Sequence, residues 1–198
     1  LALIGHANDE QLDFDTMGNI FSSDPGLTYK LLRFINNPCY GRSQEITSLK
    51  HALIYIGDIE LKKFIALLAL ADLNQNKPSE IIRLSLIRAK FCEHISLFQQ
   101  NQENPPKAFL TGLLSFIDGI LDQTLITLLD ILPVHTDIKR ALLTNDNYLA
   151  HYLNLAKNIE MGHWQASDLL IEQLALSHEQ CFIAHTKAIA WADEMLQE

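Results

Sequence analysis

Apolar residues recur at helical spacing along nearly the whole chain, and this feature restricts the fold more than any other. Between residues 25 and 35, for example, Leu27, Leu31, Phe34 and Ile35 fall on one face of a helix. No window alternates apolar and polar residues in the way that a half-buried strand requires. The sequence therefore predicts an all-α fold of about ten helices.

Start and stop signals place the ends of these helices. Asp24 followed by Pro25 predicts a helix start, because the carboxylate can cap free amides and proline has no N–H to leave unpaired. Ser48 is expected to cap a short helix that Gly57 ends, with a long helix directly after it. Further helices are predicted at residues 79–98, 107–121, 124–131, 137–143, 147–160, 164–175 and 178–196.

A polar break at residues 74–78 bears on the domain organisation. We expect one domain over residues 12–198, and the break divides it into two sub-bundles at 12–74 and 79–198. The apolar faces on both sides of the break favour joint packing. Because the chain begins with Leu1 and not with methionine, we also expect it to be cut from a longer protein.

Composition and charge exclude several classes of partner. With a net charge of −9, general nucleic-acid binding is not expected. The densest basic stretches, 61–63 and 83–90, are interpreted as solvated helix faces. The longest apolar run has eight residues, which is too short to span a bilayer, so no membrane partner is expected. Three widely spaced cysteines suit a reducing cytoplasm and argue against a structural zinc site.

The segment at residues 108–119, AFLTGLLSFIDG, is similar to the helix that carries the His-Asp metal ligands of HD-type metal phosphohydrolases. In this chain Ser115 and Phe116 stand at the two ligand positions, and Leu84 stands where the first histidine of that family would be. A benzyl ring has no lone pair for a metal, and a hydroxyl is a poor substitute for imidazole. The resemblance therefore implies the scaffold without its metal, with no catalytic residues and no cofactor. The apolar neighbours of Phe116 predict that its ring lies in the core and fills the former metal cavity.

The N-terminal half carries a longer resemblance. DPGLTYKLLRFINN at 24–37, CYG at 39–41 and ITSLKHALIYIG at 46–57 resemble the HD-related output domain (HDOD) family of bacterial signalling proteins. Looser similarities at 112–118, 132–143 and 161–164 point to the subgroup attached to EAL domains, which hydrolyse or sense cyclic di-GMP. The resemblance implies a degenerate HD-like bundle with an EAL domain upstream.

These observations predict a non-catalytic output domain in a cyclic di-GMP signalling protein. Its partner is expected to be another protein or the upstream EAL domain. The candidate contact residues are Arg33, Asn36, Asn37 and His51, because they fall off the apolar stripes where the resemblance is densest. The structural alternative is that the asparagines cap a helix end and the arginine interacts with the helix dipole. Two other functions stay open: a degenerate HD-type phosphohydrolase with a different ligand set, and a nucleotide-sensing domain.

Overall fold

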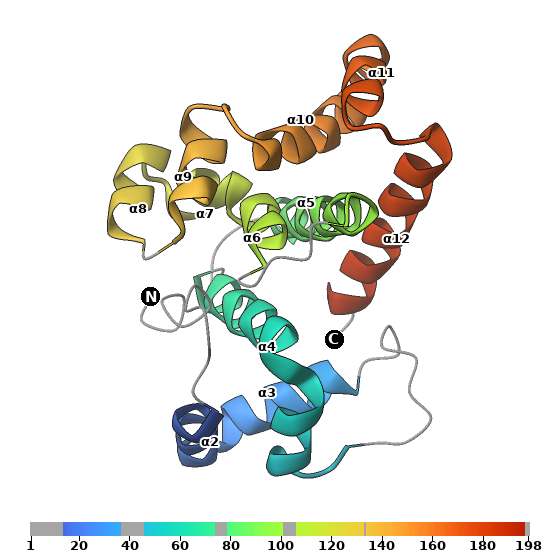
Figure 1. Cartoon of the computed structure of the whole chain (residues 1–198). Coiled ribbons are helices and arrows are strands. Elements are labelled where there is room, and N and C mark those ends of the chain that lie inside the picture. The colour runs from blue at the N-terminus through green and yellow to red at the C-terminus, as the bar shows by residue number, and fades with distance from the viewer. Residues whose placement is uncertain (1–13, 37–45, 74–78, 101–105, 133, 197–198) are drawn as a thin grey trace.

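Helices account for the architecture of the computed structural model, which describes residues 14–36, 46–73, 79–100, 106–132 and 134–196 (Figure 1). No strand occurs within these ranges, and the predicted all-α fold is confirmed. The helices are α2 (Phe14–Ser23), α3 (Pro25–Ile35), α4 (Leu49–Leu73), α5 (Ser79–Phe98), α6 (Lys107–Leu113), the 3₁₀ helix η2 (Leu114–Phe116), α7 (Ile117–Leu121), α8 (Leu125–Ile131), α9 (Thr136–Leu143), α10 (Tyr148–Glu160), α11 (Trp164–Gln173) and α12 (His178–Leu196).

The first helices begin and bend where the sequence predicts. The Asp24 carboxylate accepts hydrogen bonds from the amides of Gly26 (2.8 Å) and Leu27 (3.1 Å), which confirms the predicted cap of α3. Gly57 interrupts α4 with φ 69° and ψ 170°, a conformation that is essentially restricted to glycine. The predicted break is therefore confirmed as a sharp kink inside α4.

The later helices are arranged around α5. Helices α6 and α12 pack along α5, and α10 crosses it (Figure 1). The buried side of α5 is apolar, with Phe91, Cys92 and Ile95 fully enclosed. The ring of Phe109 on α6 meets Trp191 on α12 edge to face, with centroids 6.0 Å apart. Helix α5 is thus the central element of the C-terminal part.

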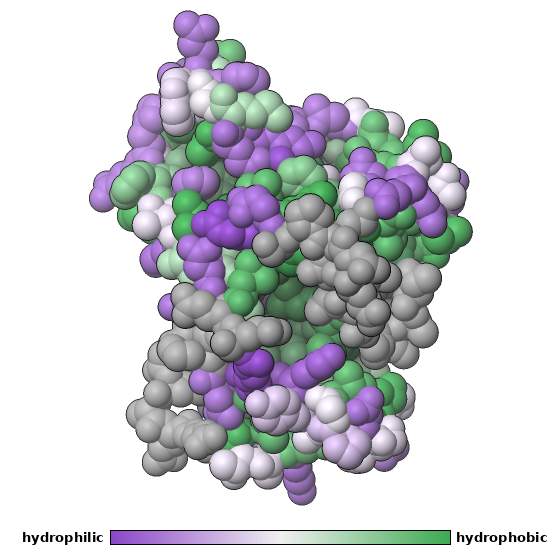
Figure 2. All heavy atoms as spheres, turned by 180° about the vertical axis from the view of Figure 1, so that it is seen from behind, coloured by the Kyte–Doolittle hydropathy of each residue, from purple (hydrophilic) through white to green (hydrophobic). Residues whose placement is uncertain are grey.

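Helix α4 connects the N-terminal helices α2 and α3 with the C-terminal group around α5. It starts among α2 and α3 and runs towards α6 (Figure 1). Buried apolar residues before and after residue 74 belong to one contiguous core, as the apolar faces on both sides suggest. Seen from behind, apolar side chains line a recess between the N-terminal helices and the later helices around α5 (Figure 2). The division into sub-bundles at 12–74 and 79–198 stays a prediction.

Basic side chains that were expected on solvated faces are buried instead. Lys62, Lys63 and Arg88 are 0%, 5% and 5% exposed. Each has an acidic partner: Lys62 pairs with Asp58 at 3.1 Å, and the other two pair with glutamates described below. The interpretation of the stretches 61–63 and 83–90 as solvated is wrong for these three residues.

Among the helices that the structure describes, none is by itself long and apolar enough to cross a bilayer. Residues Lys107–Leu121 and Leu125–Ile131 are long and apolar enough for a membrane span only when taken together, and the two segments are bent by 116° relative to each other.

Candidate functional site

The segment that resembles the metal-binding helix of HD phosphohydrolases is broken in its middle. A single helix was predicted at 107–121, but the structure has α6, the short η2 and then α7. Phe116 has φ −121° and ψ 15°, which lies outside the α-helical region. A 3₁₀ turn inside a helix commonly marks a strained or functional position. Ser115 and Phe116, at the two former ligand positions, both lie in this turn.

Gly112 allows this segment to approach α5 closely. A Cβ atom on Gly112 would lie 2.4 Å from the carbonyl carbon and oxygen of Arg88, closer than real Cβ contacts come. Any larger residue would therefore push α6 away from α5. The close packing places Arg88 directly beside η2.

Arg88 occupies the centre of the site. Its Nε donates to both carboxylate oxygens of Glu160 at 2.9 and 3.0 Å, and Nη2 donates to Oε2 at 2.6 Å. Its Nη1 donates to Ser115 Oγ at 3.2 Å. The guanidinium carbon also lies 3.7 Å from the centroid of the Phe116 ring. The arginine thus joins α5, η2 and α10 through charge-assisted hydrogen bonds and a cation–π contact.

Burial shifts the pKa of two groups near Arg88. Burial lowers the pKa of Lys157, one turn before Glu160 on α10, and the positive charge of Arg88 lowers it further. Burial raises the pKa of the Cys92 thiol to about 12, so it stays protonated near neutral pH. A protonated thiol is a weak nucleophile and a weak metal ligand.

These residues do not fit the metal of HD phosphohydrolases. Leu84 supplies an aliphatic chain, Phe116 supplies a ring, and the hydroxyl of Ser115 already accepts from Arg88. A buried guanidinium would repel a cation placed beside it. Within the described ranges, no three His, Cys, Asp or Glu side chains lie close enough together to hold a metal ion.

The prediction for Phe116 needs a correction. We expected its ring in the core, with apolar side chains filling the former cavity. The ring is only partly buried, and a charged group covers one of its faces. The cause is Arg88, whose buried guanidinium needs a carboxylate partner and packs its flat face on the ring, so polar groups enter the space.

The candidate contact residues of the N-terminal half do not all reach the surface. Arg33, on the last turn of α3, and His51, near the start of α4, are exposed. Asn36 instead caps α3, and its side chain exchanges two hydrogen bonds of 2.8 Å with the backbone of Ile46. The structural alternative holds for Asn36, which ties two chain segments together. Asn37 lies outside the described residues.

The sequence analysis missed Arg88 and Glu160. A signal for Arg88 was present, because it is a lone charge in the apolar run of residues 84–89. Such a charge inside a buried helix needs a partner. Glu160 gave no comparable signal, since it lies 72 residues further along the chain.

Comparisons with known proteins identify a family and two relatives. The family model of the HDOD domain matches residues 1–124. The chain is 30% identical over 185 residues to "Cyclic di-GMP phosphodiesterase CdgJ" of Vibrio cholerae, covering 93% of this chain and 43% of that protein. It is 29% identical over 197 residues to "Uncharacterized protein YuxH" of Bacillus subtilis, covering 98% of this chain and 47% of that protein. The chain thus spans less than half the length of these curated relatives. No solved structure matches it.

Proposed function

The chain belongs to the HDOD-domain family, and from this membership we propose that it is a non-catalytic regulatory domain in cyclic di-GMP signalling. It acts by contact with a protein partner or with an EAL domain of the same protein.

The Arg88–Glu160 pair is the observation that carries the non-catalytic part of the proposal. Hydrolysis of a phosphodiester by a metal site needs ligands that leave coordination positions open for water and substrate. In this chain a guanidinium lies beside Ser115 and Phe116 and is itself held by a carboxylate, a hydroxyl and a ring. The centre is suited to hold three helices in register and not to bind a cation.

The link to cyclic di-GMP rests on one relative. The Vibrio cholerae protein is named a cyclic di-GMP phosphodiesterase, and more than half of it lies outside the match. We assign the hydrolytic activity of such proteins to that other part and regulation to the part that corresponds to this chain.

The contact surface follows from exposure. Arg33 and His51 are exposed and polar. They lie within residues 24–37 and 46–57, where the family resemblance is densest. Exposed arginine is also a frequent contributor to protein interfaces. We therefore keep these two residues as the proposed contact and remove Asn36, whose hydrogen bonds are used internally.

A double substitution tests this proposal in a full-length protein that contains the domain. Arg33→Ala with His51→Ala should leave the melting temperature unchanged and reduce the signalling output, measured as cyclic di-GMP turnover, to that of a protein without the domain. The matched control is Arg140→Ala with His163→Ala, which removes an exposed arginine and an exposed histidine elsewhere. Normal output from the folded Arg33/His51 variant would refute the proposed contact.

A further inference from the structure

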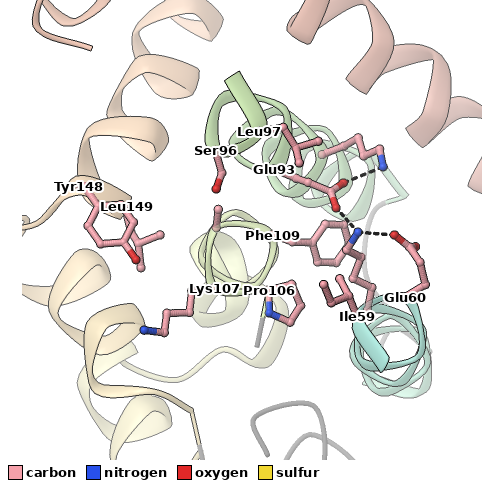
Figure 3. A pocket seen from close by; sticks show the side chains of 13 residues that line it. Ile59, Glu60, Glu93, Ser96, Leu97, Pro106, Lys107, Phe109, Tyr148 and Leu149 are labelled. Atoms are coloured by element: carbon pink, nitrogen blue, oxygen red, sulfur yellow. Dashed lines mark hydrogen bonds and ion pairs between the residues drawn. The ribbon is translucent and has the colours of Figure 1, made fainter. Parts of the chain in front are cut away.

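A pocket of about 420 Å³ lies where α4 faces α5, α6 and the start of α10 (Figure 3). It is separate from the Arg88 centre and shares no lining residue with it. Its size falls in the range of small-molecule sites, about 300–1,000 Å³. It also lies between the N-terminal and C-terminal helices, and such boundaries are common places for ligand binding.

One wall of the pocket is a chain of four charged groups. Lys63 Nζ pairs with Glu60 Oε1 at 2.5 Å and also with Glu93. The other oxygen of Glu93 accepts from Lys90 Nζ at 2.7 Å. Figure 3 marks these ion pairs with dashed lines at the labelled Glu60 and Glu93. Both carboxylate oxygens of Glu93 are therefore engaged.

The two buried members of this chain keep their charges. Burial alone would lower the pKa of Lys63, but attraction to Glu93 and Glu60 outweighs it and the pKa is raised. Burial alone would raise the pKa of Glu93, but Lys63 and Lys90 outweigh it and the pKa is lowered. Lys63 and Glu93 therefore stay ionised around neutral pH.

The lysines of this wall keep N–H bonds that a ligand can use. An ammonium group has three N–H bonds. Within the described residues, Lys63 uses two of them on carboxylates and Lys90 uses one. A third lysine of the lining, Lys107, pairs with Asp137 at 2.9 Å. A ligand with acceptor oxygens suits such a wall.

Apolar side chains lie directly beside these charged groups, and Lys63 Nζ is 5.7 Å from the centroid of the Phe109 ring. Phe109 and Leu149 form part of the pocket lining, and Ile59 and Leu97 are 38% and 48% exposed at its edge. Large apolar side chains left exposed beside a pocket gain free energy when an apolar group covers them.

We propose that this pocket binds a small organic anion, in which a carboxylate or phosphate faces Lys63 and Lys90 and an apolar body covers Phe109 and Leu97. The site gives the domain a ligand input that is independent of the proposed contact through Arg33 and His51.

Isothermal titration calorimetry on the purified chain tests the proposal with three probes: decanoate, guanosine monophosphate and inorganic phosphate. We expect saturable binding of decanoate or of guanosine monophosphate. The probe that binds shows whether the ligand carries an alkyl chain with a carboxylate or a nucleoside with a phosphate. Inorganic phosphate should not bind, because it has no apolar body. Absence of binding by both organic anions, or equal binding of inorganic phosphate, would overturn the proposal.

Two variants locate the binding. Leu97→Glu places a carboxylate at the edge of the pocket and should weaken the binding probe at least about tenfold. The matched control, Leu143→Glu, adds the same charge at an exposed leucine of α9 and should bind like the parent. Lys90→Gln should also weaken binding while Lys63 still pairs with Glu93. Parent-like affinity in both Leu97→Glu and Lys90→Gln would place the ligand elsewhere and end the proposal.

Discussion

At the scale of single residues, the central finding is that a buried arginine contacts Ser115 and Phe116, the two positions that correspond to metal ligands in the HD resemblance. Arg88 is 5% exposed, and burying a charge costs several kcal/mol unless its partners are well placed. Glu160, Ser115 and the ring of Phe116 supply these partners from two other elements. The sequence predicted that Leu84, Ser115 and Phe116 stand at ligand positions, and this stays a prediction. The sequence could not show the partners of Arg88, because the pairing depends on residues far apart in the chain.

A double-mutant cycle measures how strongly Arg88 and Glu160 depend on each other. Arg88→Leu should destabilise the chain by about 3 kcal/mol, because it leaves a largely buried carboxylate without its partner. Arg88→Leu with Glu160→Leu should recover most of that loss, since neither charge is then buried alone. Urea denaturation at neutral pH checks both values. Additive losses in the double variant would show that the two residues act separately.

The aromatic face beside Arg88 should contribute less than its carboxylate partner. Phe116→Leu keeps an apolar side chain but removes the ring, and we expect a loss of about 1 kcal/mol. The same substitution at exposed Phe182, Phe182→Leu, should have almost no effect on the urea midpoint. Equal effects at the two positions would argue against a cation–π contribution.

Glu93 should make stability depend on pH in the acid range. Its pKa is lowered in the folded state, so its contribution is present above the ordinary glutamate value of 4.5 and is lost as the pH falls through the folded pKa. The stability difference between the parent and Glu93→Gln should therefore shrink as the pH is lowered from about 6 to about 3. Exposed Glu172, substituted in the same way, is the control. A constant difference across this range would contradict the account.

At the scale of helices, most elements could be predicted from periodicity and caps, because both are local properties. The cap at Asp24, the kink at Gly57 and the helix at residues 79–98 all occur as predicted. The exception is residues 107–121, where periodicity indicated one helix and the structure has three segments. The break depends on tertiary contacts of η2 with α5, which a single segment does not encode.

The close approach of α5 and α6 gives a test at this scale. Gly112→Ala should destabilise the chain by about 2 kcal/mol or more, because the new methyl group meets the backbone of Arg88. Gly18→Ala in α2 is the control: its Cβ would make an ordinary 3.7 Å contact, and alanine favours a helix interior. Thermal melts of the two variants should move in opposite directions. A harmless Gly112→Ala would mean that the two helices can separate without cost.

At the scale of the whole molecule, the structure is an all-α HDOD domain with buried ion pairs between its helices. The family and the all-α fold could be read from the order of motifs in the sequence, and both are confirmed. The pocket beside Lys63 and the buried ion pairs could not be read in this way, since each is assembled from helices that are distant in sequence. The assignment of a regulatory role, a partner contact and a ligand site stays with the proposals above.

The most direct test of the account is the metal content of the purified full chain, measured by elemental analysis after incubation with manganese, iron or zinc and dialysis. The account predicts no near-stoichiometric metal, because Arg88 places a positive charge where a cation would have to bind. Phe116→Ala should not change this result, since it removes a ring and adds no ligand. About one metal ion per chain, lost on substitution of Ser115 or Glu160 by alanine, would contradict the account and support a metal-dependent phosphohydrolase.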